Sequence, residues 1–119
     1  MKSANSRADA KKFEKIKNKV LGNDYELSLV FAADTLTRRL NRTYRGIDKP
    51  TNILAFPLSK TSGEIFINRS RAKPFGVEYL FIHGLLHLKG MKHGATMEQT
   101  EKKLLHGASN HHRHRRRHL

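Results

Sequence analysis

The sequence predicts an α+β domain in which a small mixed β-sheet is covered by helices. Four stretches repeat apolar residues at helical spacing, and three shorter stretches carry apolar residues in patterns typical of strands. Their order is helix, strand, helix, strand, strand, helix, helix. Because no internal repeat or linker divides them, we expect one domain at residues 1–107, followed by a disordered basic tail at 108–119.

The first three elements are two helices with a strand between them. Residues 8–21 predict a helix, because their apolar side chains share one face: Phe13, Ile16, Val20 and Leu21. Residues 25–31 alternate as a strand does, with three apolar positions on one side: Leu27, Leu29 and Phe31. A second helix runs from Thr35 to about Tyr44, with Asp34 as its predicted N-cap. Its apolar residues are expected in the core: Leu36 and Leu40.

The remaining elements are two strands and two helices. Residues 52–56 predict a strand that Pro57 closes, and residues 64–68 predict a strand that pairs with it antiparallel across a short link. A long helix ends at Leu88 and should be the buried central helix, because apolar residues occur nearly all round it: Val77, Leu80, Phe81, Leu85 and Leu88. A last helix is expected from Thr96, with three apolar residues: Met97, Leu104 and Leu105.

The central helix carries a motif that predicts a metal site, His-x3-His-x2-Gly-x2-His. Residues four apart share a helix face, so His83 and His87 can direct ring nitrogens at one point. Gly90 can leave the helix through a left-handed conformation, and the returning chain would supply His93 as a third ligand. Three protein nitrogens leave a tetrahedral zinc ion one open position, which is typical of a catalytic site.

Gly84 distinguishes this motif from the motif of zinc proteases. Those enzymes place Glu directly after the first histidine, where it acts as the general base. Glycine has no side chain that could accept a proton from water on the metal. The glycine therefore argues against peptide hydrolysis by the zinc-protease route.

A basic turn upstream indicates a second functional region. Arg42, Arg45 and Lys49 lie close together in the sequence around Gly46 and Pro50. Guanidinium groups can bind phosphate oxygens through two parallel hydrogen bonds, so this turn would suit a phosphodiester substrate. The alternative is a solvated loop whose charges only keep the protein soluble.

Together these stretches resemble the bacterial YbeY family of metal-dependent endoribonucleases. The resemblance covers about residues 25–105 and rests on five segments: Asn41-Arg-Thr-Tyr-Arg-Gly46, Asp48-Lys-Pro-Thr-Asn52, Phe56-Pro57, Gly63-Glu-Ile65 and His83-Gly-Leu-Leu-His-Leu-x-Gly-x-x-His93. The resemblance implies one zinc ion per chain, held by His83, His87 and His93. It also implies that Arg45 faces the metal as a phosphate-binding and catalytic group.

The family resemblance further implies a role in the maturation of ribosomal RNA. The expected activity is single-strand-specific cleavage at the 3′ end of 16S rRNA, together with ribosome quality control. The expected partners are ribosomal RNA, the small ribosomal subunit and its proteins, and the GTPase Era. No membrane association is expected, and the location would be the cytoplasm.

Three features depart from the family pattern. Lys92 stands where the family has Asp before the third histidine, and Glu64 stands where it has Asp in the Gly-Asp-Ile strand. The link between Asn68 and Gly76 is also shorter than usual. Glu64 is a weak candidate for a general base, provided that its strand points into the cleft.

The charge of the chain favours a polyanionic partner. Lys and Arg number 24 against 10 Asp and Glu, which gives a net charge of +14. Without the four arginines of the tail this value would fall only to +10, so the body itself attracts polyanions. The chain has no Cys, and no stretch is apolar enough to span a bilayer.

The leading hypothesis is metal-assisted cleavage of single-stranded RNA. Water on the metal would be the nucleophile, Arg45 would stabilise phosphoryl charge, and Arg42 and Lys49 would help to bind the substrate. One alternative is a non-catalytic ribosome-associated assembly factor whose zinc stabilises the fold. Hydrolysis of a small phosphoester is another.

Overall fold

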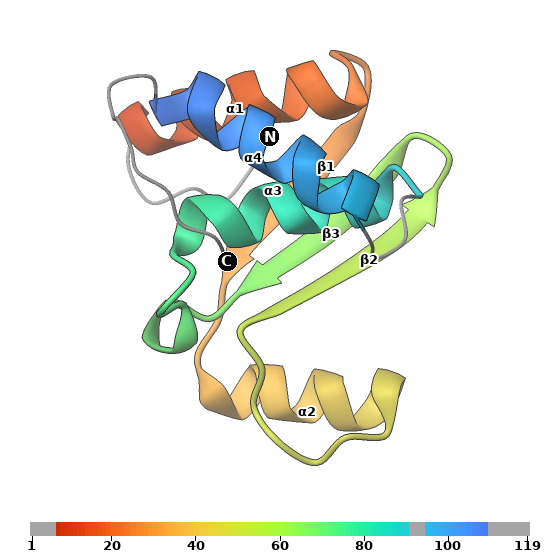
Figure 1. Cartoon of the computed structure of the whole chain (residues 1–119). Coiled ribbons are helices and arrows are strands. Elements are labelled where there is room, and N and C mark those ends of the chain that lie inside the picture. Colours follow the sequence, from red (N-terminus) through yellow and green to blue (C-terminus); the bar gives the residue numbers. More distant parts are fainter. Residues whose placement is uncertain (1–6, 91–94, 110–119) are drawn as a thin grey trace.

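The computed structural model describes residues 7–90 and 95–109 (Figure 1). The elements in this part of the chain follow the predicted order, with one added short 3-10 turn. They are α1 (Arg7–Leu21), β1 (Glu26–Phe31), α2 (Asp34–Arg45), β2 (Ile53–Ser59), β3 (Ser62–Ile67), η1 (Arg69–Arg71), α3 (Val77–Leu88) and α4 (Ala95–Ser109).

The three strands form a mixed sheet in the order β1-β3-β2, which confirms the predicted fold class. Strand β3 pairs parallel with β1 and antiparallel with β2. In this register Ile65 of β3 lies between Leu29 of β1 and Ala55 of β2. Leu29 and Ile65 are fully buried, so the apolar alternation of the strands sets the face that meets the core.

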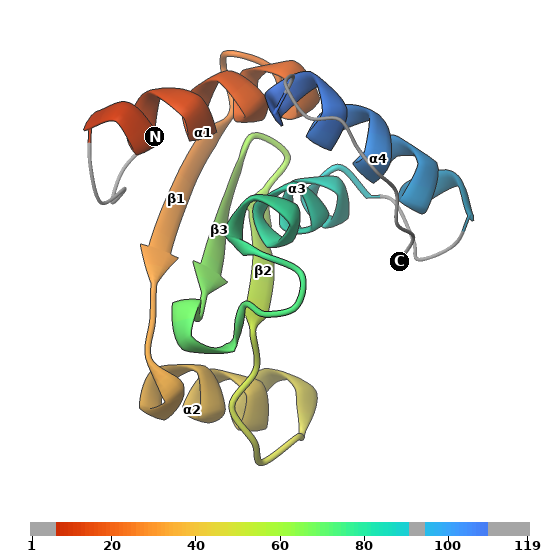
Figure 2. The ribbon, with the colours of Figure 1, turned by 60° about the vertical axis from the view of Figure 1, so that its left-hand side comes forward.

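Helix α3 is the centre of the molecule, as its apolar composition predicts. It packs against the sheet on one side, and α1 and α4 lie on its other side (Figures 1 and 2). Its buried residues occur on almost every side of the helix: Leu80, Phe81, Ile82, Gly84, Leu85 and Leu86. Phe81 meets Phe13 of α1 with the ring centroids 4.7 Å apart. Helix α3 is therefore held from both sides by the core.

Gly84 allows α3 to approach the sheet closely. A Cβ atom at this position would lie 3.0 Å from Cδ1 of Ile65 and 3.1 Å from Cδ1 of Ile53. Both distances are shorter than ordinary carbon–carbon contacts. A glutamate at this position, as in zinc proteases, would meet the sheet, so the structure gives a packing reason for the glycine.

Helix α2 lies across the end of the sheet, away from the main core (Figure 2). Its buried residues are polar, namely Thr37 and Asn41, whereas Leu36 and Leu40 are only half-buried. The prediction that these leucines join the core was therefore wrong. Hydrogen bonds fix this helix instead, since buried Asn68 donates to Asp34 at 2.8 Å and to Thr37 at 3.3 Å.

Two predicted boundaries were also wrong. Pro57 lies inside β2, which continues to Ser59, because an edge strand can hold a residue that lacks an N–H. Ala33, rather than Asp34, is the N-cap of α2. Asp34 lies in the first turn, where its carboxylate accepts hydrogen bonds from Arg71 at 2.7 and 2.8 Å.

Candidate active site

A cavity of about 590 Å³ lies between α3, β2 and the end of α2. The residues that line it fall into two groups, which we name after their histidine and arginine side chains. The histidine side comes from α3: His83, Gly84 and His87. The arginine side comes from α2 and the segment after it: Arg45, Thr51 and Asn52. Strand β2 forms the wall between them with Ile53, Ala55 and Pro57.

The two histidines of α3 direct their Nε2 atoms toward each other. These atoms lie 3.1 Å apart, as expected for residues one helical turn apart on the same face. Two nitrogens that bind one tetrahedral zinc ion lie about 3.3 Å apart, because Zn–N bonds are about 2.0–2.1 Å long. The observed separation therefore fits a pair of ligands to a single ion.

The third predicted ligand, His93, lies outside the described residues, and so does Lys92. Gly90, which precedes them, has a φ of +100°, so the chain leaves α3 in a conformation that favours glycine. Among the residues that the structure describes, no three His, Cys, Asp or Glu side chains form a metal-binding group. The described part of the site is thus a pair of histidines followed by a glycine turn.

Glu101 of α4 is a site residue that the sequence analysis missed. Its side chain is 3% exposed, and its Oε2 atom lies 2.5 Å from Nδ1 of His83. Its Oε1 atom accepts a hydrogen bond of 3.0 Å from the hydroxyl of Tyr79. Burial and the nearby Glu101 carboxylate raise the pKa of Tyr79 to about 12, so its hydroxyl remains a donor at neutral pH.

A sequence signal for Glu101 does exist. It stands four residues after Met97 and three before Leu104, which places an acidic side chain on the apolar face of the last helix. A buried carboxylate needs a partner, so an acidic residue on such a face indicates a hidden contact. The sequence does not reveal that His83 is that partner, because α3 and α4 meet only through the tertiary fold.

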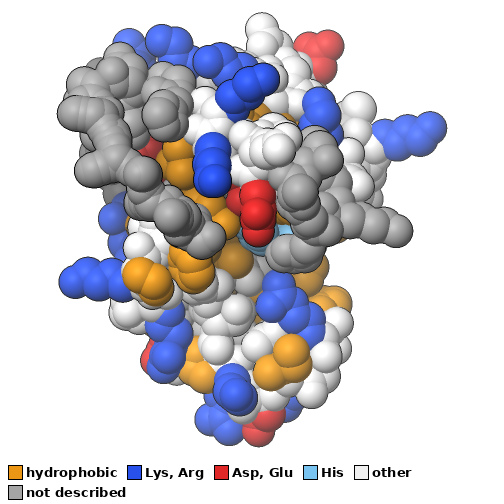
Figure 3. Space-filling view, in the orientation of Figure 1, with side chains coloured by type: hydrophobic (Ala, Val, Ile, Leu, Met, Phe, Trp, Pro, Cys, Tyr) orange, Lys and Arg blue, Asp and Glu red, His pale blue; other side chains and the backbone are white. Residues whose placement is uncertain are grey.

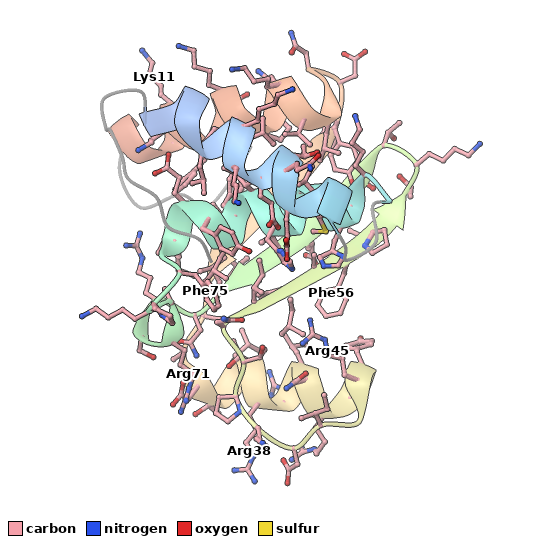
Figure 4. All side chains as sticks on the ribbon, in the orientation of Figure 1. Lys11, Arg38, Arg45, Phe56, Arg71 and Phe75 are labelled. Carbon is pink, nitrogen blue, oxygen red and sulfur yellow. The ribbon has the colours of Figure 1, made fainter. Side chains whose placement is uncertain are left out.

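Arg45 reaches the cavity from the last turn of α2. Figure 4 shows its side chain directed from the helix toward β2, whereas Arg38 points away from the sheet. Its Nη2 atom donates to the carbonyl of Ile53 at 3.2 Å, and its Nη1 atom donates to Oδ1 of buried Asn41 at 3.4 Å. Asn41 in turn donates to the carbonyl of Lys49 at 2.9 Å. Asn41 therefore links Arg45 to the backbone of Lys49 within the basic turn.

The other residues predicted for substrate binding or catalysis do not line the cavity. Arg42 lies 3.5 Å from Asp48, which also receives two hydrogen bonds from Arg38, at 2.8 and 3.1 Å. Lys49 is exposed. Glu64 is the strand neighbour of buried Ile65, so its side chain lies on the opposite face of the sheet from α3. The structure brings together His83, His87 and Arg45.

Several Lys and Arg side chains share the face of the molecule on which a histidine surface is visible (Figure 3). They lie above and below that histidine surface, and an acidic side chain lies directly beside it. Lys17 does not contribute to the surface, because its side chain is buried. It is 2% exposed, and its Nζ donates to the carbonyls of Gly22 and Tyr25. No helix within 7–90 and 95–109 combines the length and apolar character needed to cross a bilayer.

Comparison with known proteins identifies the family of this chain. The family model described as Endoribonuclease YbeY matches residues 2–114. The chain belongs to the YbeY family. A YbeY from Persephonella marina is 32% identical over 124 residues, which cover 85% of this chain and 78% of that relative. The YbeY resemblance expected from the histidine and arginine motifs is therefore confirmed.

Other YbeY relatives are longer than the matched region. A YbeY from Methylocella silvestris is 37% identical over 106 residues, covering 71% of this chain and 60% of that protein. The chain thus spans about three fifths of that relative's length. A protein of Thermotoga maritima, solved in solution, superposes with a TM-score of 0.60 at 26% identity and covers 91% of this chain and 87% of that one.

Proposed function

We propose that this chain is a zinc-dependent endoribonuclease that cleaves single-stranded RNA. The observation that carries the proposal is that Arg45 lines the same cavity as His83 and His87, whose Nε2 atoms lie 3.1 Å apart. A phosphodiester needs both a group that polarises its oxygens and a cation that stabilises the charge developing on them. The names of the YbeY relatives and the net charge of +14 support RNA as the substrate.

His83, His87 and His93 would hold the zinc ion. A bound zinc ion supplies Lewis acidity, which polarises a phosphoryl oxygen and makes a bound water more acidic. Arg45 would bind the non-bridging oxygens of the scissile phosphate. A guanidinium has five N–H donors, and the bonds to Asn41 and Ile53 engage two of its nitrogens while they hold its plane.

The walls of the cavity would orient the RNA. Apolar Ile53, Ala55 and Pro57 give the β2 wall little capacity to bind water strongly, so the phosphate would exchange water for Arg45 and the metal. The Lys and Arg side chains of the surface would attract the RNA strand to the cavity, and counterions would be released when it binds.

We further propose that the substrate is ribosomal RNA of the small subunit. The process would be 3′-end processing of 16S rRNA, together with ribosome quality control. The small subunit, its proteins and the GTPase Era would be the cytoplasmic partners.

The test is zinc content measured together with cleavage of a single-stranded RNA. The protein should be full-length, with the four tail histidines replaced by Asn so that they bind no metal: His111, His112, His114 and His118. We expect one zinc per chain, unchanged cleavage in this tail variant, and loss of both zinc and cleavage when His87→Ala is added.

Each other outcome contradicts a defined part of the proposal. A tail variant without zinc would show that the histidine pair is not part of a zinc site. Zinc content that depends on His87 while cleavage does not would remove the metal from the reaction. Zinc and RNA binding without cleavage of free or ribosome-bound RNA would support the non-catalytic assembly factor instead.

A further inference from the structure

The two ring nitrogens of His83 face different partners, and these partners bear on which nitrogen carries the proton. Nε2 points toward His87 at the cavity, and Nδ1 meets Oε2 of Glu101. A carboxylate group accepts hydrogen bonds and does not donate them, so in a hydrogen bond to the Glu101 carboxylate Nδ1 is the donor and carries the proton. In the neutral imidazole this tautomer leaves a lone pair on Nε2, which is the atom that would bind a metal.

Glu101 is itself fixed in place. It is buried between α3 and α4, and each of its oxygens has a named partner, Nδ1 of His83 and the hydroxyl of Tyr79. The Tyr79 ring also stacks on the His83 ring at an interplanar angle of 27° with the centroids 6.0 Å apart. The same two side chains of α3 therefore contact each other and share one carboxylate.

We propose that Glu101 is a positioning residue of the metal site, which fixes the tautomer and ring orientation of His83, and that Tyr79 holds Glu101 in place. This inference rests on the proposed function, because it assigns Glu101 a role toward the zinc ion. It also makes α4 part of the site, although none of the described α4 side chains lines the cavity. Carboxylate partners of this kind make a ligand more basic and restrict its motion.

The test compares Glu101→Gln with Glu98→Gln in the background that lacks the tail histidines. Glu98 lies one turn earlier on α4 and is exposed, so its variant removes the same charge outside the buried contact between Glu101 and His83. The first measurement is Zn²⁺ affinity, by competition with a chelating dye. We expect Glu101→Gln to weaken zinc binding about 10- to 100-fold, Tyr79→Phe to weaken it less, and Glu98→Gln to leave it unchanged.

The second measurement is the tautomer of His83 in metal-free protein, read from ¹⁵N chemical shifts. We expect an Nδ1–H tautomer in the parent protein and in Glu98→Gln. In Glu101→Gln, the carbonyl of the new amide can accept from Tyr79 while its N–H₂ donates to Nδ1, so we expect the proton to move to Nε2. A residue that only joined α4 to α3 would not control this signal.

These two readouts separate the possible failures. If the parent binds no zinc, the proposed metal site fails, while the tautomer still decides whether Glu101 orients His83. If Glu101→Gln binds zinc as tightly as Glu98→Gln, the positioning role is overturned. If Glu101→Gln does not fold, Tyr79→Phe serves as the test, and zinc affinity and a tautomer equal to those of the parent would overturn the proposal.

Discussion

The histidine side and the arginine side of the cavity are held by different forces. His83 and His87 stand on a helix whose apolar residues are buried on nearly every side, and the side chain of Glu101 behind them is 3% exposed. Arg45 stands on an exposed turn of α2, a helix that buries only Thr37 and Asn41. Packing of the core therefore fixes one side, whereas hydrogen bonds, ion pairs and one ring contact, between Tyr44 and Phe56, fix the other.

This difference indicates which side can move. Shifting α3 would break close contacts throughout the core, because protein interiors are packed as densely as crystals. Shifting α2 would disturb hydrogen bonds and exposed ion pairs such as Arg38–Asp48, and exposed pairs contribute only about 0–1 kcal/mol each. We infer a rigid histidine side and an adaptable arginine side, which would suit the flexible backbone of the proposed RNA substrate.

The largest effect expected on the arginine side is loss of cleavage in Arg45→Ala. In the proposed mechanism Arg45 stabilises the transition state, so its removal should lower kcat by about 100- to 1000-fold. Zinc affinity should be unchanged, because Arg45 reaches the cavity from the other side. Arg38→Ala is the matched control, since Arg38 lies on the same helix and points away from the sheet. Equal cleavage by the two variants would exclude Arg45 from the mechanism.

A smaller effect is expected from Gly84→Ala on the histidine side. The added Cβ would press on Ile65 and Ile53, and overpacking of this kind typically costs about 1–3 kcal/mol. The higher helix propensity of Ala would offset at most about 1 kcal/mol of this loss. Urea unfolding should show a net loss of stability that is reduced in the Ile65→Val background, which removes the nearest methyl group. A gain in stability would show that α3 does not pack tightly against the sheet, and would contradict a rigid histidine side.

The smallest effect concerns the attachment of α2 through Asp34. Hydrogen bonds from Arg71 and Asn68 lower the pKa of Asp34 from 3.8 to about 2. Because the folded-state pKa is depressed, its stabilisation is present above the unfolded value and is lost as the pH falls from about 4 toward 2. Asp34→Asn should therefore unfold at a slightly lower urea concentration at about pH 7, and the difference from the parent should shrink toward about pH 2.5. A difference that stays constant with pH would contradict the ion-pair account.

The sequence predicted the parts of the fold that depend on periodicity. The alternation of Leu27 and Leu29 located β1, and the apolar run around Phe81 identified the central helix. The sequence could not predict how α2 is attached, because the buried contacts of Asn68 with Asp34 and Thr37 join residues more than 30 positions apart. The same limit explains why the spacing of the histidines was visible in the sequence and their contact with Glu101 was not.

The strand order has a consequence for how the chain assembles. Strand β3 is the last strand to be synthesised but the middle strand of the sheet, so β1 meets its parallel partner only after residues 62–67 have been made. The β2–β3 hairpin, by contrast, forms from neighbouring residues and pays little loop-closure entropy. We expect this hairpin to form early in folding. Strand β1 and the helices would join the hairpin afterwards. The cavity, which needs β2, α2 and α3 together, would then be among the last features of the molecule to exist.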